Sequence, residues 1–311
     1  MTQELHFSTD KKIRLDEFLR QELPARINAQ ISNSKIRRLI VAGAVSVNNR
    51  QTARPSFELR GKSEITIKLD LEKLFYEKQP DDIKFEVTAD SVLYEDEKLI
   101  FINKPAFFPV EQTITGNRDN LHDAVVRYLW SKNPELRNPP YVGIMHRLDR
   151  ETSGVILFTK TRAINKQISD MFQSHSFVKK YLAVVPAKEK LNDGTPLAPG
   201  TSFTVEMNMK RISSSSQAAK WGPSGKDEGL YSKTDFKVLR PVTIENKNCL
   251  LIECTLFTGR THQIRVHLSS KGLPILGDTL YNAPSASRIY LHSCELTSEM
   301  FSVKAECDFI S

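Results

Sequence analysis

The feature that most constrains the fold of this chain is a series of short apolar runs that begins near residue 90. Polar residues bound each run, and every run is shorter than an ordinary buried helix. Four of them occupy residues 99–102, 155–158, 181–185 and 250–252. Such runs are typical of buried strands, and helical segments such as residues 162–174 lie between them. The sequence therefore predicts a mixed α+β domain around a large sheet.

The preceding part of the chain has helical spacing instead. Residues 13–24 place their large apolar side chains on one face of a predicted helix, which Pro24 is expected to end. A second helix is expected to begin at Ser34, a residue that suits an N-cap, and to end near Gly43. Residues 45–47 then alternate apolar and polar side chains, which predicts a strand that enters a turn.

The second predicted helix has a basic face. Lys35, Arg37 and Arg38 lie opposite its apolar residues, so they are candidates for contact with a polyanion. Residues 11–60 hold eleven Lys or Arg and four Asp or Glu, an excess that equals the net charge of +7 of the whole chain. Such a face can follow a sugar–phosphate backbone without reading bases, although the solvated face of any small domain can carry the same residues.

A chain of 311 residues is long enough for two domains. We expect a small domain over residues 11–70, a charged linker over 71–88 and a larger domain over 89–311. No apolar stretch approaches the roughly 20 residues that a membrane span needs, and no signal peptide is expected at the N-terminus. The expected location is therefore the cytoplasm.

The cysteines and histidines do not have the spacing of a metal centre. The four cysteines are scattered, and none belongs to a Cys-x-x-Cys pair, so neither a disulfide framework nor a zinc site is expected. The sequence also has no Walker-type phosphate loop and no convincing dinucleotide-binding fingerprint. We therefore expect no metal and no bound cofactor.

The segment with the strongest chemical character runs from Met145 to Gly154 and reads Met-His-Arg-Leu-Asp-Arg-Glu-Thr-Ser-Gly. It lies between two apolar segments, so Asp149 is expected on a loop between strands, where catalytic side chains often stand on a rigid scaffold. Gly154 is expected to permit a tight turn. A carboxylate beside arginines is usually a surface ion pair, so a catalytic assignment depends on further matching segments.

The segment from His146 to Gly154 resembles the signature of the RluA-type pseudouridine synthases, which modify uridines in ribosomal or transfer RNA. The other segments that are similar to this family are residues 102–105 (Ile-Asn-Lys-Pro), residues 180–184 (Lys-Tyr-Leu-Ala-Val), and residues 258–268 with their continuation at 273–281. The segments occur in the right order and span nearly all of the predicted larger domain.

Residues 13–68 resemble the small S-four-like RNA-binding domain, named after a small-subunit ribosomal protein. The two resemblances together imply an α+β protein in which a small helix–strand RNA-binding domain precedes a catalytic domain with a large mixed, mainly antiparallel β-sheet. The chain departs from the family after Pro105, where a Gly-containing turn and Val-His are usual. Residues 106–111 read Ala-Phe-Phe-Pro-Val-Glu instead, which is expected to alter this loop and the choice of target.

The family resemblance implies a role for three side chains. Asp149 matches the catalytic aspartate, Tyr181 matches the tyrosine whose ring packs against the target base, and Arg265 matches the basic residue that pairs with the aspartate.

Pseudouridine formation breaks the N1–C1′ bond of a uridine and joins C1′ to C5 of the same uracil, so it needs no cofactor and no metal. An ionised carboxylate can attack C1′ or can take a proton from the sugar, and the sequence leaves both routes open. Burial would raise the pKa of Asp149, whereas a guanidinium beside it would lower that pKa again. A contact between Asp149 and Arg265, across more than a hundred residues of chain, is therefore predicted.

The resemblance implies structured RNA as the partner, with large-subunit ribosomal RNA favoured over transfer RNA by the S-four-like domain. The target nucleotide must leave its helix, and an aromatic ring such as that of Tyr181 can hold the extruded base. Arg147, Arg260 and His262 are expected to contact RNA phosphates or to brace the loops. The default expectation is a monomer.

Three alternatives remain open at this point. One is a synthase directed to transfer RNA, and another is a non-catalytic RNA-binding or ribosome-assembly protein. The third is an N-glycosidase, which would release free uracil.

Overall fold

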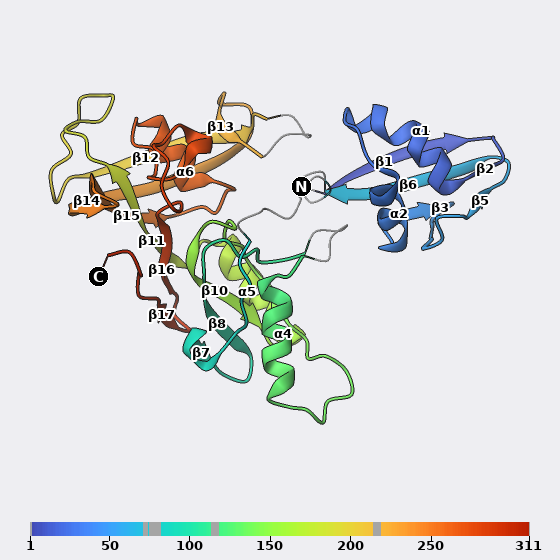
Figure 1. The fold of residues 1–311 in the computed structure, drawn as a ribbon, viewed down its shortest axis with the longest axis horizontal. Coiled ribbons are helices and arrows are strands. Elements are labelled where there is room, and N and C mark those ends of the chain that lie inside the picture. The colour runs from blue at the N-terminus through green and yellow to red at the C-terminus, as the bar shows by residue number, and fades with distance from the viewer. Residues whose placement is uncertain (1, 71–73, 75–81, 113–117, 214–218, 311) are drawn as a thin grey trace. The chain divides into compact units, whose positions relative to one another are not determined.

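The computed structural model describes residues 2–70, 74, 82–112, 118–213 and 219–310 (Figure 1). The chain divides into two compact units. The first comprises Met1–Pro80, Gln112–Arg118 and Ile212–Lys220, and the second comprises Asp81–Glu111, Asp119–Arg211 and Trp221–Ser311. Most of the linker predicted over 71–88 lies outside the described residues. No helix within the described ranges is long and apolar enough to cross a membrane.

The first unit packs two helices against a small antiparallel sheet. The helices are α1 (Leu15–Ile27) and α2 (Asn33–Val41). The sheet has the order β1 (Thr2–Thr9), β6 (Ser63–Asp70), β3 (Val45–Val47) and β4 (Arg50–Gln51), and a separate pair joins β2 (Ile13–Arg14) to β5 (Glu58–Leu59). Leu19 of α1, Leu39 of α2 and Ile67 of β6 are fully buried in the shared core.

The structure corrects both helix boundaries that the sequence predicted in this unit. Helix α1 continues through Pro24 to Ile27 and ends at Asn28 in the left-handed conformation, because Leu23 and Ile27, one turn apart, are both buried. Helix α2 begins after Ser32 rather than Ser34, and the Ser32 hydroxyl accepts a 3.3 Å hydrogen bond from the backbone of Lys35. Both serines are suitable N-caps, so the sequence alone does not separate them.

The described residues of the second unit form an eleven-stranded mixed sheet. Its central order is β13 (Trp221–Ser224), β12 (Ser202–Arg211), β14 (Leu230–Ile244), β15 (Lys247–Leu256), β11 (Val178–Pro186), β16 (Leu291–Thr297), β10 (Ser153–Thr159), β8 (Leu99–Lys104) and β7 (Val92–Glu95). Strands β17 (Ser302–Lys304) and β9 (Gly143–Ile144) pair with β16 and β10. Strands β10 and β16 are parallel, and the other recorded pairs are antiparallel, so the predicted fold class is confirmed.

Helices cover both faces of this sheet. Helix α4 (Leu121–Ser131) packs on one face of β8 and β10, and α5 (Asn165–Gln173) packs on the other. Helix α6 (Gln263–Ser270) packs on β11, β14 and β15 (Figure 1). Short 3₁₀ turns lie at Ala89–Ser91 (η1), Arg162–Ile164 (η2) and Thr279–Tyr281 (η3).

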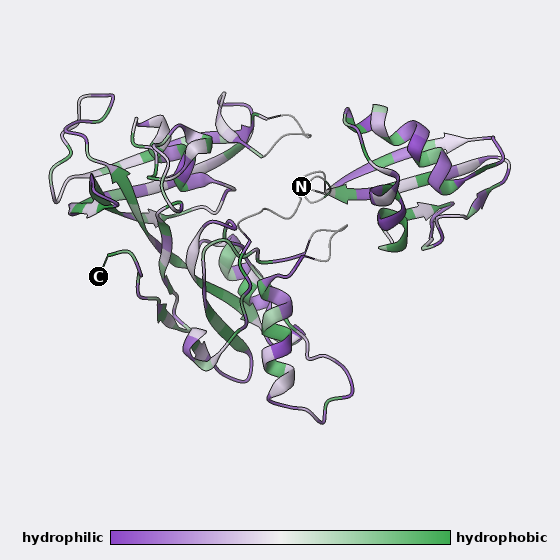
Figure 2. Cartoon of the chain, in the orientation of Figure 1, coloured by the Kyte–Doolittle hydropathy of each residue, from purple (hydrophilic) through white to green (hydrophobic). Residues whose placement is uncertain are grey.

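The apolar runs that the sequence analysis used are buried strands. They lie in β8, β10, β11 and β15, and Figure 2 shows hydrophobic residues concentrated along β8 and β10. All seven residues of β10 are buried. The loop that enters β10 therefore stands on a rigid base.

Gly154 does not form the predicted turn but lies within β10, where the strand meets the parallel strand β16. It pairs with Ser293 and has a φ of +109°. A Cβ atom at this position would overlap the carbonyl oxygen of Ser293, so the glycine permits a close approach of two strands.

Replacing Gly154 by alanine is therefore expected to lower the free energy of unfolding by at least about 2 kcal/mol, and the melting temperature by about 5 °C or more. Thermal unfolding of the full chain measures both. Gly225→Ala is the matched control, because open space surrounds that exposed residue. Equal melting temperatures for the two variants would show that β16 can move away at little cost.

Candidate active site

Asp149 lies on the loop between β9 and β10, as the sequence predicted. The backbone of Thr152 donates a 3.1 Å hydrogen bond to the carbonyl oxygen of Asp149, which closes a turn directly before the strand. The Asp149 side chain retains 24% of its exposure. The carboxylate is thus held at the end of a buried strand and can still be reached from outside.

Arg265, in the first turn of α6, contacts this carboxylate. Its Nη1 donates a 3.2 Å hydrogen bond to Oδ2 of Asp149, so the predicted contact across the chain is present. Its Nε and Nη2 donate to the two oxygens of Asp278, at 2.7 and 2.9 Å. Asp278 is fully buried, and the two-pronged contact fixes the plane of the guanidinium. Sequence reasoning assigned no role to Asp278, although it lies in the matching segment 273–281.

The charges around Asp149 keep it ionised. Burial alone would raise the pKa of this carboxyl, but His262, when it is protonated, and the guanidinium of Arg265 together outweigh burial and lower it. Burial also lowers the pKa of His262, despite the attraction of Asp149. The permanent charge at neutral pH is therefore the guanidinium of Arg265. Burial disfavours that charge too, but Asp278 and Asp149 more than compensate and raise the pKa of Arg265.

His262 lies beside the carboxylate rather than on an outer RNA-facing surface. Its Nε2 is 3.8 Å from Oδ2 of Asp149, and its Nδ1 is 3.0 Å from the hydroxyl of Tyr281. It precedes α6 with a φ of +57°, a conformation that is uncommon outside glycine. The prediction that His262 contacts RNA phosphate stays a prediction, and its place next to Asp149 was not foreseen.

Lys104 is a second residue that sequence reasoning did not single out. Its side chain is fully buried at the end of β8, and burial lowers its pKa to about 7. The Nζ donates hydrogen bonds to the carbonyl oxygens of Pro105, Phe108 and Arg150, at 2.8, 2.7 and 2.9 Å. Lys104 therefore ties the loop after β8 to the loop that carries Asp149. Its only sequence signal was the Asn-Lys-Pro string.

Tyr181 lies in the middle of the sheet on β11, opposite Cys254 of β15 and Ser293 of β16. The half-buried ring packs against two hydrophobic clusters, one that includes residues of α6 and one that includes residues of α4. Burial, with a smaller contribution from the charge of Asp149, raises the pKa of Tyr181 to about 12. The side chain is therefore a neutral phenol at physiological pH.

The loop after β8, where the sequence departs from the family pattern, contacts both arginines that flank Asp149. Glu111 forms a 2.8 Å ion pair with the exposed Arg147. The guanidinium of Arg150 lies 5.3 Å from the centre of the Phe107 ring. The Glu and the extra aromatic bulk therefore shape the edge of the candidate site.

The remaining predicted RNA contacts are spread over both units. In the second unit, Arg260 precedes α6, and its Nε donates a 3.0 Å hydrogen bond to the carbonyl oxygen of Tyr231. Lys35, Arg37 and Arg38 belong to α2 of the first unit, where Arg37 is exposed and its Nε is 3.8 Å from Asp16.

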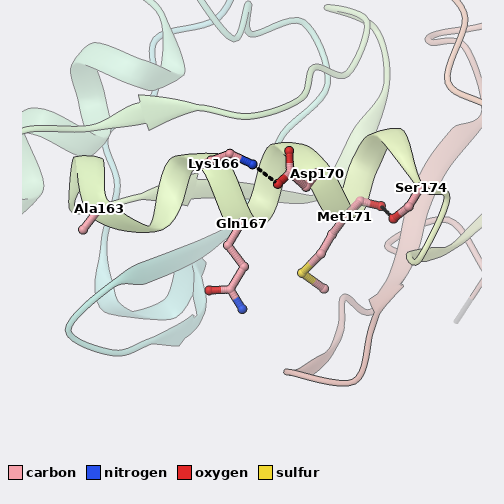
Figure 3. A pocket seen from close by; sticks show the side chains of 6 residues that line it. All are labelled: Ala163, Lys166, Gln167, Asp170, Met171 and Ser174. Carbon is pink, nitrogen blue, oxygen red and sulfur yellow. Dashed lines mark hydrogen bonds and ion pairs between the residues drawn. The ribbon is translucent and has the colours of Figure 1, made fainter.

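Two other features are not part of this site. Figure 3 shows a pocket on the surface of α5, which contains the ion pair of Lys166 with Asp170 and none of the residues discussed above. His292, Cys307 and Asp308 place three possible metal-ligand atoms within 4.8 Å of one another. Asp308 already pairs with Arg288 at 3.0 Å, and burial raises the pKa of the Cys307 thiol to about 11, so this group favours its present contacts over a metal.

Comparisons with known proteins agree on one family. A family model described as RNA pseudouridylate synthase matches residues 98–270. Ribosomal large subunit pseudouridine synthase D of Zymomonas mobilis is 32% identical over 270 residues, which cover 86% of this chain and 76% of that protein. Ribosomal large subunit pseudouridine synthase C of Escherichia coli is 29% identical over 314 residues, which cover 95% of this chain and 89% of that protein.

A solved structure has the same fold. Human RNA pseudouridylate synthase domain containing 4 superimposes with a TM-score of 0.54 at 22% identity, over 70% of this chain and 88% of that one. At this level of identity the likeness shows the fold alone.

Proposed function

The chain belongs to the RNA pseudouridylate synthase family and isomerises uridines in RNA, and from this premise we propose that Asp149 is its catalytic carboxylate and large-subunit ribosomal RNA its substrate. The observation that carries the catalytic assignment is the 3.2 Å contact between Asp149 and Arg265. In this contact the Asp149 carboxylate is still partly exposed, and it is charged at neutral pH because its pKa is lowered. Asp278, the other carboxylate that Arg265 contacts, is fully buried and cannot be reached from outside.

The charged carboxylate suits the sugar of the target nucleotide. In the first route, an oxygen of Asp149 bonds to C1′ while the N1–C1′ bond breaks, and the uracil leaves with the electron pair. In the second route, the carboxylate takes a proton from the sugar as uracil departs. Rotation of the uracil then presents C5 to C1′. In the first route C5 bonds to C1′ as the bond from Asp149 to C1′ breaks, and in the second route the sugar regains its proton from Asp149 as C5 bonds to C1′. Transfer of the proton on C5 to N1 completes the product. Both routes need the same ionised Asp149.

Tyr181 is the proposed platform for the detached base. The uracil must be extruded from its helix and kept close to the sugar while it turns, and stacking on an aromatic ring contributes on the order of 1–3 kcal/mol. The ring lies on β11, and the charge of Asp149 acts on its hydroxyl, which supports a location near the carboxylate.

The proposed substrate follows from the names of the relatives, which are ribosomal large subunit synthases. The resemblance of the first unit to an S-four-like domain supports the same choice. The cytoplasmic location and the monomeric state that the sequence indicated stay predictions.

Mapping pseudouridines in all RNA from cells with and without this gene tests the substrate. We expect one or more sites in large-subunit ribosomal RNA to remain uridine when the gene is absent and to be restored by the wild-type gene. Loss of sites only in transfer RNA would favour the transfer RNA alternative. Release of free uracil by the purified protein would indicate an N-glycosidase instead.

Helix α2 is the proposed RNA-binding face of the first unit. Replacing Lys35, Arg37 and Arg38 together by glutamine is expected to weaken binding and to flatten the dependence of log affinity on log salt by about 0.7–0.9 per lost phosphate contact. Filter binding of ribosomal RNA at several salt concentrations measures the slope. The control is Arg20→Gln on α1, an exposed arginine 3.7 Å from Glu17. An unchanged slope in the triple variant would remove this face from the RNA interface.

A further inference from the structure

We propose that His262 is a positioning residue that donates a hydrogen bond from its Nε2–H to the carboxylate of Asp149, and that the hydroxyl of Tyr281 holds the imidazole in the tautomer that makes this donation possible. The inference rests on the proposed function, because it takes Asp149 to be the catalytic carboxylate. It gives His262 a role other than the contact with RNA phosphate that the sequence indicated. It also assigns a role to Tyr281, to which the sequence motifs gave none.

His262 connects a buried phenol to the catalytic carboxylate through its two ring nitrogens. Its Nδ1 is 3.0 Å from the hydroxyl of Tyr281, and its Nε2 is 3.8 Å from Oδ2 of Asp149. The second distance is longer than a direct hydrogen bond, which is common for catalytic contacts before the substrate binds. The His262 side chain is only 12% exposed, so its partners are those within the protein.

The backbone of His262 has an uncommon conformation. The residue lies directly before α6 with a φ of +57°, and its carbonyl oxygen accepts a 2.9 Å hydrogen bond from the backbone of Val266. Non-glycine residues persist in this conformation where the surrounding structure holds them, and such residues cluster at functional sites. The imidazole is therefore held at the same end of α6 that carries Arg265.

Tyr281 contacts both groups that approach the carboxylate. Its ring is 5% exposed and lies edge to face against that of His262, with 5.8 Å between the ring centres and 84° between the planes. The guanidinium of Arg265 lies 5.3 Å from the centre of the same ring. The Tyr281 hydroxyl is also 3.0 Å from both the backbone nitrogen and the carbonyl oxygen of Trp221 on β13. These contacts hold the phenol in place.

The positions of the protons follow from a count of donors. The N–H of Trp221 donates to the Tyr281 oxygen, and the single proton of that hydroxyl has two acceptors within reach, the Trp221 carbonyl oxygen and Nδ1 of His262. Burial lowers the pKa of His262, so at neutral pH the imidazole is neutral and carries one proton. The location of that proton decides what Asp149 meets.

The carboxylate favours the proton on Nε2. With the proton on Nδ1, the lone pair of Nε2 would face a negatively charged oxygen of Asp149. With the proton on Nε2, Nδ1 accepts from the Tyr281 hydroxyl and the carboxylate faces a donor. A hydrogen bond to a charged acceptor is roughly twice as strong as one between neutral groups, so the second arrangement outweighs the bond from the hydroxyl to the Trp221 carbonyl oxygen.

Both donors approach the same oxygen of Asp149. Nη1 of Arg265 and Nε2 of His262 lie 3.2 and 3.8 Å from Oδ2, whereas none of the recorded contacts of Asp149 with the described part of the chain involves Oδ1. Two donors on Oδ2 fix the plane of the carboxylate. Oδ1 is therefore the oxygen that is available to the sugar of the target nucleotide.

The tautomer can be measured in the full chain without any RNA. Selective ¹⁵N labelling of the seven histidines and NMR at neutral pH distinguish a protonated ring nitrogen from an unprotonated one, and the signals missing from His262→Asn identify His262. We expect the proton on Nε2. A proton on Nδ1 in the wild-type protein would overturn the proposal.

Tyr281→Phe tests the role of the hydroxyl, because it keeps the ring beside Arg265. Loss of one hydrogen bond is expected to lower the ratio of the Nε2–H to the Nδ1–H tautomer about tenfold, which the same NMR experiment measures. Tyr290→Phe is the matched control. It removes another buried hydroxyl, one that bonds to Glu245 at 2.8 Å and to Ser287 at 3.1 Å, and it should leave the signals of His262 unchanged. An unchanged ratio in Tyr281→Phe would overturn the part of the proposal that concerns Tyr281.

Two substitutions of His262 separate the donor from the fold. The side-chain amide nitrogen of glutamine can take the place of Nε2, whereas that of asparagine can take only the place of Nδ1. On the RNA in which the wild type forms pseudouridine, His262→Asn should lower kcat about 10- to 100-fold, the range for a hydrogen bond to a charged group, and leave KM within about twofold. His262→Gln should retain kcat within about threefold of the wild type.

His175 provides the control for both substitutions. It is an exposed histidine with the same φ of +57°, so His175→Asn and His175→Gln make the same changes at the same backbone conformation and should leave kcat and KM unchanged. Asparagine tolerates this conformation better than glutamine does. A purely structural role of His262 therefore predicts the reverse order, with His262→Gln less active than His262→Asn, and that order would overturn the proposal.

The outcomes also separate this inference from the proposed function. A rise in KM at constant kcat in His262→Asn would indicate a contact with RNA and would overturn the positioning role. If the wild type formed no pseudouridine in any RNA while NMR showed the proton on Nε2 and its dependence on Tyr281, the tautomer would stand and the proposed function would fail.

Discussion

Asp149→Asn is expected to abolish pseudouridine formation, with kcat reduced at least about 10⁴-fold. The amide has the size of the carboxylate and can still accept a hydrogen bond from Arg265. It carries no negative charge, so it can neither bond to C1′ nor take a proton from the sugar. Quantifying pseudouridine in a ribosomal RNA transcript under single-turnover conditions measures the effect.

The control for this substitution is Asp170→Asn on α5, the exposed aspartate that pairs with Lys166 (Figure 3). It should leave kcat unchanged. RNA affinity should be retained in Asp149→Asn, because the substitution removes a negative charge from a surface that binds a polyanion. Product formation by Asp149→Asn within tenfold of the wild-type rate would remove this residue from the chemistry.

Arg265→Gln is expected to have the second largest effect, because it removes the partner of two carboxylates at once. Asp278 is fully buried and would lose both of its hydrogen bonds from the guanidinium. Breaking a buried ion pair by removing one partner typically costs about 3–5 kcal/mol, which for a unit of this size lowers the melting temperature by about 10 °C. Asp149 would also lose the charge that keeps it ionised, so kcat at neutral pH should fall as well.

Asp278→Asn separates the two consequences. It keeps the contact of Arg265 with Asp149 and removes only the buried negative charge. We expect it to lower the melting temperature, measured by thermal unfolding, while it retains more activity than Arg265→Gln. If Asp278→Asn were as inactive as Arg265→Gln, the orientation of the guanidinium rather than its charge would be the decisive property.

The parts of the site that could be predicted from the sequence are those held in contiguous strings. Asp149 lies in a polar string between two apolar runs, so both its loop and its neighbours followed from local pattern. The contact with Arg265 was implied by the family resemblance, and chemistry supported it, because a partly buried carboxylate that must stay charged needs a cation. The apolar runs of β8, β10, β11 and β15 indicated a large sheet for the same local reason.

The other parts depend on contacts that no local pattern reveals. Asp278 and Arg265 meet only because α6 and the segment after it fold together. Lys104 follows a buried run and therefore looks like a lysine at an exposed strand end, whereas its three carbonyl partners come from two separate loops. The role of Gly154 depends on β16, which lies about 140 residues away in sequence and beside it in the sheet. Strand β1 has only two large apolar residues, Leu5 and Phe7, and it pairs with β6, which lies about 60 residues later in the sequence.

The central claim is that the guanidinium of Arg265 holds the pKa of Asp149 low, and the pH dependence of kcat/KM in wild type and Arg265→Gln tests it most directly. Since the pKa of Asp149 is lowered in the folded protein, its ionised form persists as the pH falls and is lost only below the range of an ordinary aspartate, about 3.9. In the wild type, loss of activity through protonation of Asp149 should therefore appear only below about pH 4, apart from any step that Lys104 adds near pH 7. Without Arg265, burial is offset only by His262 and Lys104, so the pKa of Asp149 rises and the acid limb of the residual activity moves toward neutral pH. Two profiles that superimpose after scaling would contradict the claim.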